Sequence, residues 1–167
     1  SSAASDVYKR QELIRGVINS SAILLNQNEI TLDFTQQEPL YAWADEFKVE
    51  EVVTNYLSNA IHHAEGEKRI DISCVQKGDK VRVSVFNTGN PIPEEDVDNI
   101  WIKFYKVDKA RTREYGGSGI GLSIVRAIMD SFHQKCGVIN HEDGVEFWFE
   151  LETNNGNFSV DKSYQKC

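Results

Sequence analysis

Gly116-Gly117-Ser118-Gly119-Ile120-Gly121-Leu122 is the stretch that decides the fold, because four glycines in six residues lead directly into an apolar run at helical spacing. That run consists of Ile120, Ile124, Val125, Ala127, Ile128 and Phe132. Glycine lets a backbone approach a ligand closely, and the first N–H groups of a helix have no partner within it. These groups and the positive end of the helix dipole favour an anion, so the stretch predicts a phosphate-binding loop. A flexible loop before an ordinary amphipathic helix is the alternative that this stretch alone leaves open.

The composition is that of a globular protein, and 167 residues suit one domain with a substantial core. The net charge of −8 argues against general nucleic-acid binding, which needs a basic surface. Cys74, Cys136 and Cys167 are odd in number and widely spaced, which disfavours a disulfide or metal scaffold and fits a reducing cytoplasmic setting. No apolar run is long enough to span a membrane.

Apolar periodicity predicts alternating helices and strands along the chain. The expected helices cover residues 8–27, about 46–64 and the glycine-opened segment, with short helical turns over 94–105; the expected strands cover 30–34, 41–44, 69–75, 81–85, 137–141 and 145–151. This order predicts an α/β (α+β) two-layer sandwich, with one helix layer on a mixed, mostly antiparallel sheet. Residues 8–152 form the expected domain, between a linker or remnant at 1–7 and a polar tail at 153–167.

The helix expected after Asp45, a suitable N-cap, carries Asn55, Asn59 and His62 at the edge of its apolar stripe. These three side chains fall within about 60° of one another around the helix axis. Asparagine is a mediocre helix former, so two of them one turn apart favour a functional interpretation. The chemistry that fits is a carbonyl-oxygen ligand for a hard cation. A solvated polar face is the alternative.

Two further segments indicate a ligand site. The strand ending at Phe86 runs into Asn87-Thr88-Gly89-Asn90-Pro91-Ile92-Pro93, a sharp exit loop of the kind where ligands often bind. Residues 103–114 carry five basic and two acidic side chains in an otherwise acidic protein, directly before the glycine loop. A basic segment in that place predicts a lid over an anion, and a solvated charged loop is the alternative.

Four motifs in this order resemble one family, the catalytic and ATP-binding domains of sensor histidine kinases. Asn55-Tyr56-Leu57-Ser58-Asn59-Ala60 resembles the N box of that family, and Asn87-Thr88-Gly89 through Pro93 resembles the G1 box. Trp101-Ile102-Lys103-Phe104-Tyr105-Lys106-Val107-Asp108 resembles the F box, and the glycine stretch resembles the G2 box. The resemblance spans roughly residues 8–152. It implies the Bergerat ATP-binding fold of the GHKL superfamily, which gyrase B, Hsp90 and MutL share.

The resemblance implies a role for each matching residue. Asn59 would bind Mg²⁺ through its side-chain oxygen, Asn55 would lie beside it near the phosphates, and Lys106 would approach the terminal phosphates; these three are the expected catalytic residues. Asn87 would contact adenine, and residues 107–116 would form the ATP lid. The full expected ATP site comprises Asn55, Asn59, His62, His63, Asn87, Gly89, Ile92, Phe104, Tyr105, Lys106, Gly117, Ser118, Gly119, Ile120, Gly121 and Leu122. Phe104 would pack the lid or contact the phosphoacceptor domain.

The chain departs from the family pattern at a few positions. Asn55 stands where ATPase relatives have a water-activating glutamate, and an amide is no useful base near neutral pH, so hydrolysis by water is disfavoured. Asn87 replaces the usual aspartate, Pro91 a glycine, and His62 and His63 the usual lysine and tyrosine. A neutral His62 would hold phosphate less firmly than lysine does.

Asn87 raises a hypothesis about base choice. An amide oxygen can accept a hydrogen bond from the adenine amino group as a carboxylate does, without the charge. A flipped amide could donate to the carbonyl of guanine instead. We therefore expect ATP binding with weaker discrimination against GTP.

The phosphoacceptor motif of the family, a histidine followed by an acidic residue and Leu-Arg/Lys-Thr-Pro, does not occur in the sequence. The resemblance therefore implies that this chain is a catalytic fragment, itself monomeric, and the cytoplasmic domain of a membrane-anchored sensor that is a homodimer. With ATP and Mg²⁺ it would phosphorylate a histidine on the dimerisation domain, for relay to a response regulator receiver domain. A non-catalytic nucleotide-binding or docking module is the alternative function.

Overall fold

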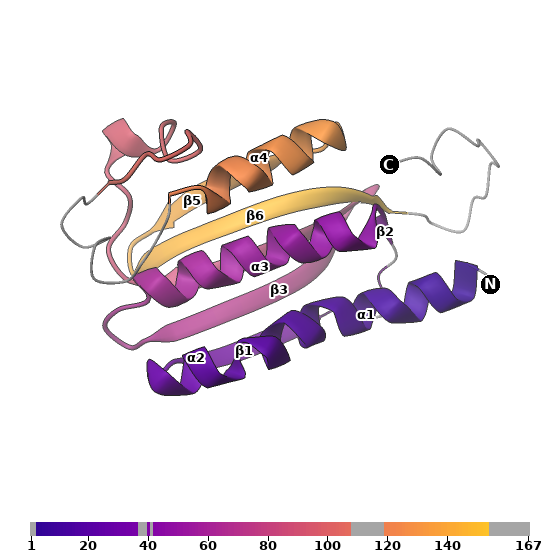
Figure 1. The fold of residues 1–167 in the computed structure, drawn as a ribbon, viewed down its shortest axis with the longest axis horizontal. Helices are drawn as coiled ribbons and strands as arrows, with labels where there is room; N and C mark the ends of the chain where they lie inside the picture. Colours follow the sequence, from indigo (N-terminus) through magenta and orange to yellow (C-terminus); the bar gives the residue numbers. More distant parts are fainter. Residues whose placement is uncertain (1–2, 37–39, 41, 108–118, 154–167) are drawn as a thin grey trace.

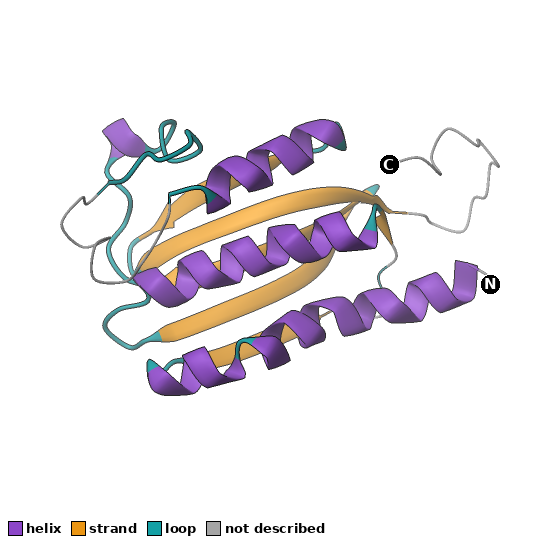
Figure 2. Ribbon diagram, in the orientation of Figure 1, coloured by secondary structure: helices purple, strands orange, loops and turns teal. Residues whose placement is uncertain are grey.

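The computed structural model describes residues 3–36, 40, 42–107 and 119–153, and places its helices as a layer over one face of a sheet (Figures 1 and 2). In chain order the elements are α1 (Ala3–Ser20), α2 (Ala22–Gln27), β1 (Thr31–Gln36), β2 (Ala42–Trp43), α3 (Glu46–His63), β3 (Arg69–Lys77), β4 (Lys80–Thr88), the 3₁₀ turn η1 (Glu94–Asp96), α4 (Gly121–Ser131), β5 (Cys136–His141) and β6 (Gly144–Thr153). The two-layer α/β architecture expected from the sequence is confirmed.

The described strands form one six-stranded sheet with the order β1-β3-β4-β6-β2, in which β5 also pairs with β6. The β1–β3 pair is parallel and the other pairs are antiparallel, as a mixed, mostly antiparallel sheet requires. The long hairpin of β3 and β4 aligns Ile72 with Val85, and β4 aligns Val85 with Phe147 of β6. This register sets one row of apolar side chains across the sheet, facing the helices.

Helix α3 lies across the middle of this apolar face, between α1 and α4 (Figure 1). Its residues Val52, Val53, Tyr56 and Leu57 are fully buried. The Tyr56 ring packs on Phe147 and Phe149 with centroids 5.4 and 6.0 Å away, and its hydroxyl donates to the Trp148 carbonyl at 3.0 Å. Complete burial explains why the pKa of Tyr56 is raised. The core therefore fixes α3 rigidly, and with it the two asparagines on its edge.

The capping of α3 agrees with the sequence. The Asp45 carboxylate accepts hydrogen bonds from the backbone N–H groups of Phe47 at 2.9 Å and Lys48 at 3.3 Å. Such a cap typically contributes about 1 kcal/mol to helix stability. The sequence also predicts the apolar stripe correctly, although Ile61 joins it at 7% exposure.

Three details differ from the sequence-based expectations. The helix expected over 8–27 is two helices, since the chain turns at Ser21, and α1 already begins at Ala3, within the segment expected to be a linker. The Ser20 hydroxyl donates to the Gly16 carbonyl at 2.9 Å, a bond of the type that bends helices just before this break. On α4, Ala127 is exposed and Met129 is buried in its place.

The other face of the sheet carries paired charges. Arg82 on β4 lies 2.6 Å from Glu150 on β6 and stacks 4.0 Å above the ring of Trp148. Trp148 is thus half-covered by its own sheet. None of the helices in the described part of the chain combines the length and apolarity that crossing a membrane requires.

Candidate functional site

The first turn of α4 lies against Asn55 on α3, which joins the expected N and G2 boxes. The Asn55 amide nitrogen donates to the Glu51 carbonyl at 2.9 Å, which fixes the side chain. A Cβ on Gly121 would lie 2.9 Å from the Asn55 amide oxygen, so a larger residue there would displace the Asn55 amide. Because Asn55 is half-buried and committed to its own helix, it is a poor candidate for activating water.

Asn59 lies one turn further along α3 and is half-buried. Its side chain forms no hydrogen bond with another described residue, so its amide oxygen is available to a ligand. No group of three potential metal-binding His, Cys, Asp or Glu side chains exists among the residues that the structure describes. Asn59 would therefore supply only one neutral oxygen to a magnesium ion, and phosphates and water would have to supply the other ligands.

The end of the expected F box contacts Gly119 of the glycine stretch. The Phe104 N–H donates to the Gly119 carbonyl at 2.8 Å, and both residues have positive φ angles, 67° and 70°. A Cβ on Gly119 would lie 3.1 Å from the Phe104 Cα and 3.5 Å from Cε of Lys106. Lys106 therefore lies beside the glycine stretch, and it forms no ion pair with another described residue.

The neighbours of this contact have defined places. The Tyr105 hydroxyl donates to the Asp96 carboxylate, a hydrogen bond that raises the pKa of Tyr105. Phe104 is 62% exposed, whereas Ile120 and Leu122 are half-buried at the start of α4. Gly116, Gly117, Ser118 and all of the lid expected over 107–116 except Val107 lie outside the described residues.

Asn87, the expected adenine contact, lies near the end of β4 and is 2% exposed. Its amide nitrogen donates to the Thr88 carbonyl at 3.1 Å. The amide oxygen is thereby the atom left to accept a hydrogen bond from a ligand. A flip would bring this oxygen against the Thr88 carbonyl, oxygen to oxygen. The orientation argues against the amide flip on which weaker discrimination against GTP depends.

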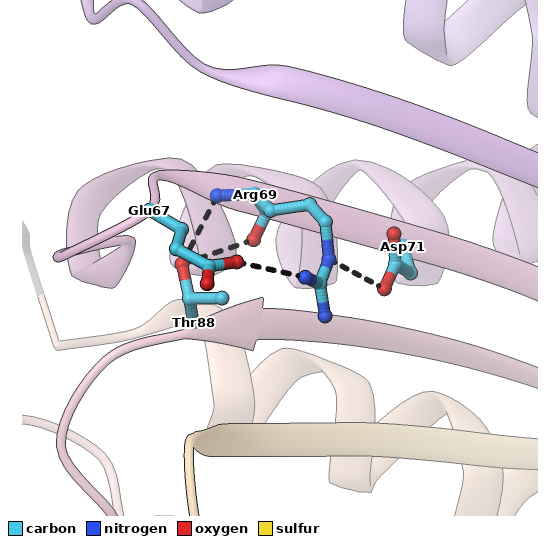
Figure 3. Close-up of polar contacts among 4 residues, drawn as sticks. All are labelled: Glu67, Arg69, Asp71 and Thr88. Carbon is cyan, nitrogen blue, oxygen red and sulfur yellow. Dashed lines mark hydrogen bonds and ion pairs between the residues drawn. The ribbon is translucent and has the colours of Figure 1, made fainter.

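Thr88 and Arg69 lock the end of β4 to the start of β3 (Figure 3). The Arg69 N–H donates to the Thr88 hydroxyl at 3.0 Å, and this hydroxyl lies 3.4 Å from the Arg69 carbonyl. The Arg69 guanidinium bridges Glu67 and Asp71 at 2.9 and 3.0 Å. Hydrogen bonding to Asp71 is the main cause that raises the pKa of Arg69. Hydrogen bonds therefore hold β4, the strand that carries Asn87, to β3 as far as its last residue, Thr88.

The loop after β4 is tied to two further elements. The Glu65 N–H, just after α3, donates to the Thr88 carbonyl at 2.9 Å, and the Gly89 N–H donates to the Asp143 carbonyl at 3.0 Å. Gly89 has φ 147°, and a Cβ there would lie 2.8 Å from the His63 carbonyl. His62 and His63 have exposed side chains at this end of α3. The C-terminal half of α3 thus lies between the expected G1 and G2 boxes.

One side chain at this loop, that of Asn140, was not predicted from the sequence. Asn140 on β5 accepts a hydrogen bond from the Ile92 N–H at 2.9 Å and donates one to the Ile92 carbonyl at 2.7 Å. The signal was present in the alternation of β5, since Asn140 shares the inward-facing row with Val138. A polar residue in such a row needs a partner.

Comparison with known proteins agrees with this arrangement. The family described as "Histidine kinase-, DNA gyrase B-, and HSP90-like ATPase" matches residues 44–155. The sensor protein IrlS of Burkholderia pseudomallei is 39% identical over 95 residues, which are 57% of this chain and 20% of IrlS. The chain therefore spans about a fifth of that relative.

Solved structures cover more of the chain. The catalytic domain of histidine kinase ThkA superposes with a TM-score of 0.76 at 35% identity, covering 85% of this chain and 91% of that domain. Full-length ShkA in complex with AMPPNP gives a TM-score of 0.74 at 25% identity, covering 85% of this chain and 29% of ShkA. The chain belongs to the histidine kinase-, DNA gyrase B- and HSP90-like ATPase family, as a domain of the histidine kinase catalytic type.

Proposed function

We propose that this domain binds ATP with Mg²⁺ and transfers the γ-phosphoryl group to a histidine on a separate dimerisation domain. The observation that carries the proposal is the contact between Asn55 and Gly121, which sets the first turn of α4 against α3 one turn before Asn59, whose side chain has no hydrogen-bond partner among the described residues. A helix N-terminus opened by glycine and a neutral oxygen ligand are what a magnesium-bound triphosphate requires. The ATPase family name and the AMPPNP complex of ShkA support the choice of nucleotide.

Different residues would contact the base and the phosphates of the nucleotide. Asn87 accepts a hydrogen bond from the adenine amino group, with Gly89 and Ile92 shaping the loop around the base. Asn59 would hold the magnesium ion, which would supply positive charge beside the phosphates. Lys106 and the backbone at Gly119 and Gly121 approach the phosphates. His62, His63, Phe104 and Tyr105 border the site, and residues 107–116 would form the lid.

Transfer to histidine fits better than hydrolysis. The chain has an amide at Asn55, and this amide is bonded to the Glu51 carbonyl, so the position provides no general base for water. The γ-phosphoryl group would instead form a P–N bond with an imidazole nitrogen, and ADP would leave. The phosphohistidine would then serve a response regulator receiver domain. ThkA has been solved in complex with the response regulator protein TrrA, which supports this partner class.

The full-length protein would be a homodimeric sensor with this domain on the cytoplasmic side. Relatives named as sensor proteins, of which the chain spans about a fifth, support that assignment.

A phosphotransfer assay tests the proposal. The domain is mixed with γ-labelled ATP, Mg²⁺ and a separately produced dimerisation domain from a sensor histidine kinase. We expect acid-labile, alkali-stable label on the dimerisation domain and none on the catalytic domain alone. Binding of ATP without any transfer would favour the non-catalytic nucleotide-binding or docking module. Stable self-labelling of the domain alone would contradict transfer to a separate domain.

A further inference from the structure

The segment Pro91-Ile92-Pro93 has few backbone hydrogen-bond donors. Proline has no N–H, so Ile92 contributes the only backbone N–H of these three residues. Ile92 is half-buried and packs against the hydrophobic core, where an unpaired N–H would be costly. The position of this segment therefore depends on what Ile92 bonds to.

The partner is one side chain, that of Asn140 on β5. Its amide oxygen accepts from the Ile92 N–H at 2.9 Å, and its amide nitrogen donates to the Ile92 carbonyl at 2.7 Å. The amide thus replaces the partner strand that an extended residue would have in a sheet. Both bonds require the same orientation of the amide, because a flip would set donor against donor and acceptor against acceptor.

The same hairpin holds the other end of the loop. The carbonyl of Asp143, in the turn between β5 and β6, accepts from the Gly89 N–H at 3.0 Å. Across the sheet, Asn140 on β5 is aligned with Val145 on β6, and Val145 is aligned with Asn87 on β4. The loop from Gly89 to Ile92 is therefore held at both ends by β5 and β6, next to Asn87.

We propose that Asn140 is a positioning residue of the nucleotide site, which fixes Ile92 against the adenine base by bonding both of its backbone groups. This inference rests on the proposed function, in which Asn87 and Ile92 receive adenine. Asn140 acts through Ile92 and so orders the loop that receives the base. Without it, the loop would lose its fixed path and the base would bind a less ordered surface.

The test compares Asn140→Ala with Asn28→Ala. Asn28 also donates from its side chain to a backbone carbonyl, that of Leu24 at 2.7 Å, but at the end of α2. Both variants lose an asparagine-to-backbone hydrogen bond, so a purely structural role predicts lower stability and unchanged nucleotide binding in both. We measure Kd for ATP and ADP by calorimetry, the unfolding midpoint, and hydrogen exchange of the Ile92 amide by NMR.

We expect Asn140→Ala to raise Kd for ATP and ADP by the same factor, about tenfold, since neutral hydrogen bonds of this kind contribute modestly. Ile92 exchange should accelerate at least as much, and Asn28→Ala should leave both quantities within about twofold of the parent. Asn140→Asp is the second variant, in case the alanine variant does not fold. It keeps an acceptor for the Ile92 N–H but sets a carboxylate oxygen against the Ile92 carbonyl, so we expect a similar loss.

Two results would overturn the inference in distinguishable ways. If the parent binds ATP and both Asn140 variants bind it as tightly as the parent does, Asn140 only stabilises the fold. If the parent binds neither ATP nor ADP, the proposed function fails, and the positioning role fails with it.

Discussion

On the adenine side of the proposed site, hydrogen bonds tie the chain from Asn87 to Ile92 to β3, β5, the β5–β6 turn and the end of α3. On the phosphate side, the side chains of Asn59 and Lys106 form neither a hydrogen bond nor an ion pair with any other described residue. The adenine side is thus built before a ligand arrives, whereas these two polar side chains on the phosphate side have no partner among the described residues. Base recognition should therefore depend on the fold, and phosphate binding on the ligand and its magnesium ion.

Among the substitutions that test this difference between the two sides, Gly89→Ala should have the largest effect. The new Cβ would lie 2.8 Å from the His63 carbonyl at a φ of 147°, so the loop must shift away from α3. We expect a loss of about 2–3 kcal/mol in the free energy of unfolding and at least tenfold weaker ATP binding. Denaturant titration and calorimetry measure the two effects.

Gly78→Ala is the matched control for Gly89→Ala. Gly78 also has a positive φ, 62°, but a Cβ there meets no atom within 4 Å. It should cost about 1 kcal/mol of stability through backbone strain alone and leave ATP binding unchanged. Equal effects of both substitutions on ATP affinity would show that the adenine loop needs no fixed path.

Asn59→Ala should produce the next largest effect, and only on the phosphate side. We expect the variant to lose about tenfold in ATP affinity with Mg²⁺ and to match the parent without it, because one metal ligand is removed. The fold should be intact, since Asn59 flanks the core. Thr54→Ala, at an exposed position of the same helix, is the control. Equal magnesium dependence in the Asn59 variant and the parent would reduce Asn59 to a helix-surface residue.

A smaller effect is expected from Asn87→Ala. The variant loses the acceptor for the adenine amino group, so we expect about fivefold weaker ATP binding, near 1 kcal/mol. Because the amide nitrogen is bonded to the Thr88 carbonyl, the parent should also prefer ATP to GTP, and the alanine variant should lose this preference. Calorimetry with both nucleotides measures it. Equal affinity of the parent for ATP and GTP would mean that the amide flips after all.

The smallest expected effect belongs to His62→Lys. His62 is exposed at the end of α3, and a fixed positive charge there should strengthen ATP binding about twofold at low salt, less at high salt. Asn26→Lys, at an exposed site on α2, adds the same charge elsewhere. If both substitutions strengthen binding equally, His62 has no particular place beside the phosphates.

The sequence predicted the fold well because local rules govern it. Alternating apolar residues specify β3, β4 and β6, and Asp45 with the stripe from Val49 to Ala64 specifies α3. The N-box asparagines and the glycines were found for the same reason, since spacing along one helix or loop reveals them.

Contacts between distant segments could not be predicted. Asn140 bonds a residue 48 positions away, and the Asn55–Gly121 contact depends on how α3 and α4 pack. The orientation of the Asn87 amide follows from the carbonyl of Thr88, whose direction is set by the end of the β3–β4 ladder. Single-sequence periodicity does not contain this information.

A calorimetric titration of the domain with ATP and with adenosine, each with and without Mg²⁺, tests the difference between the two sides most directly. We predict that Mg²⁺ tightens ATP binding at least tenfold, while adenosine binds weakly and with the same affinity in both buffers. Two results would contradict a preformed adenine side joined to a magnesium-dependent phosphate side: the same affinity for ATP with and without Mg²⁺, or no binding of either ligand.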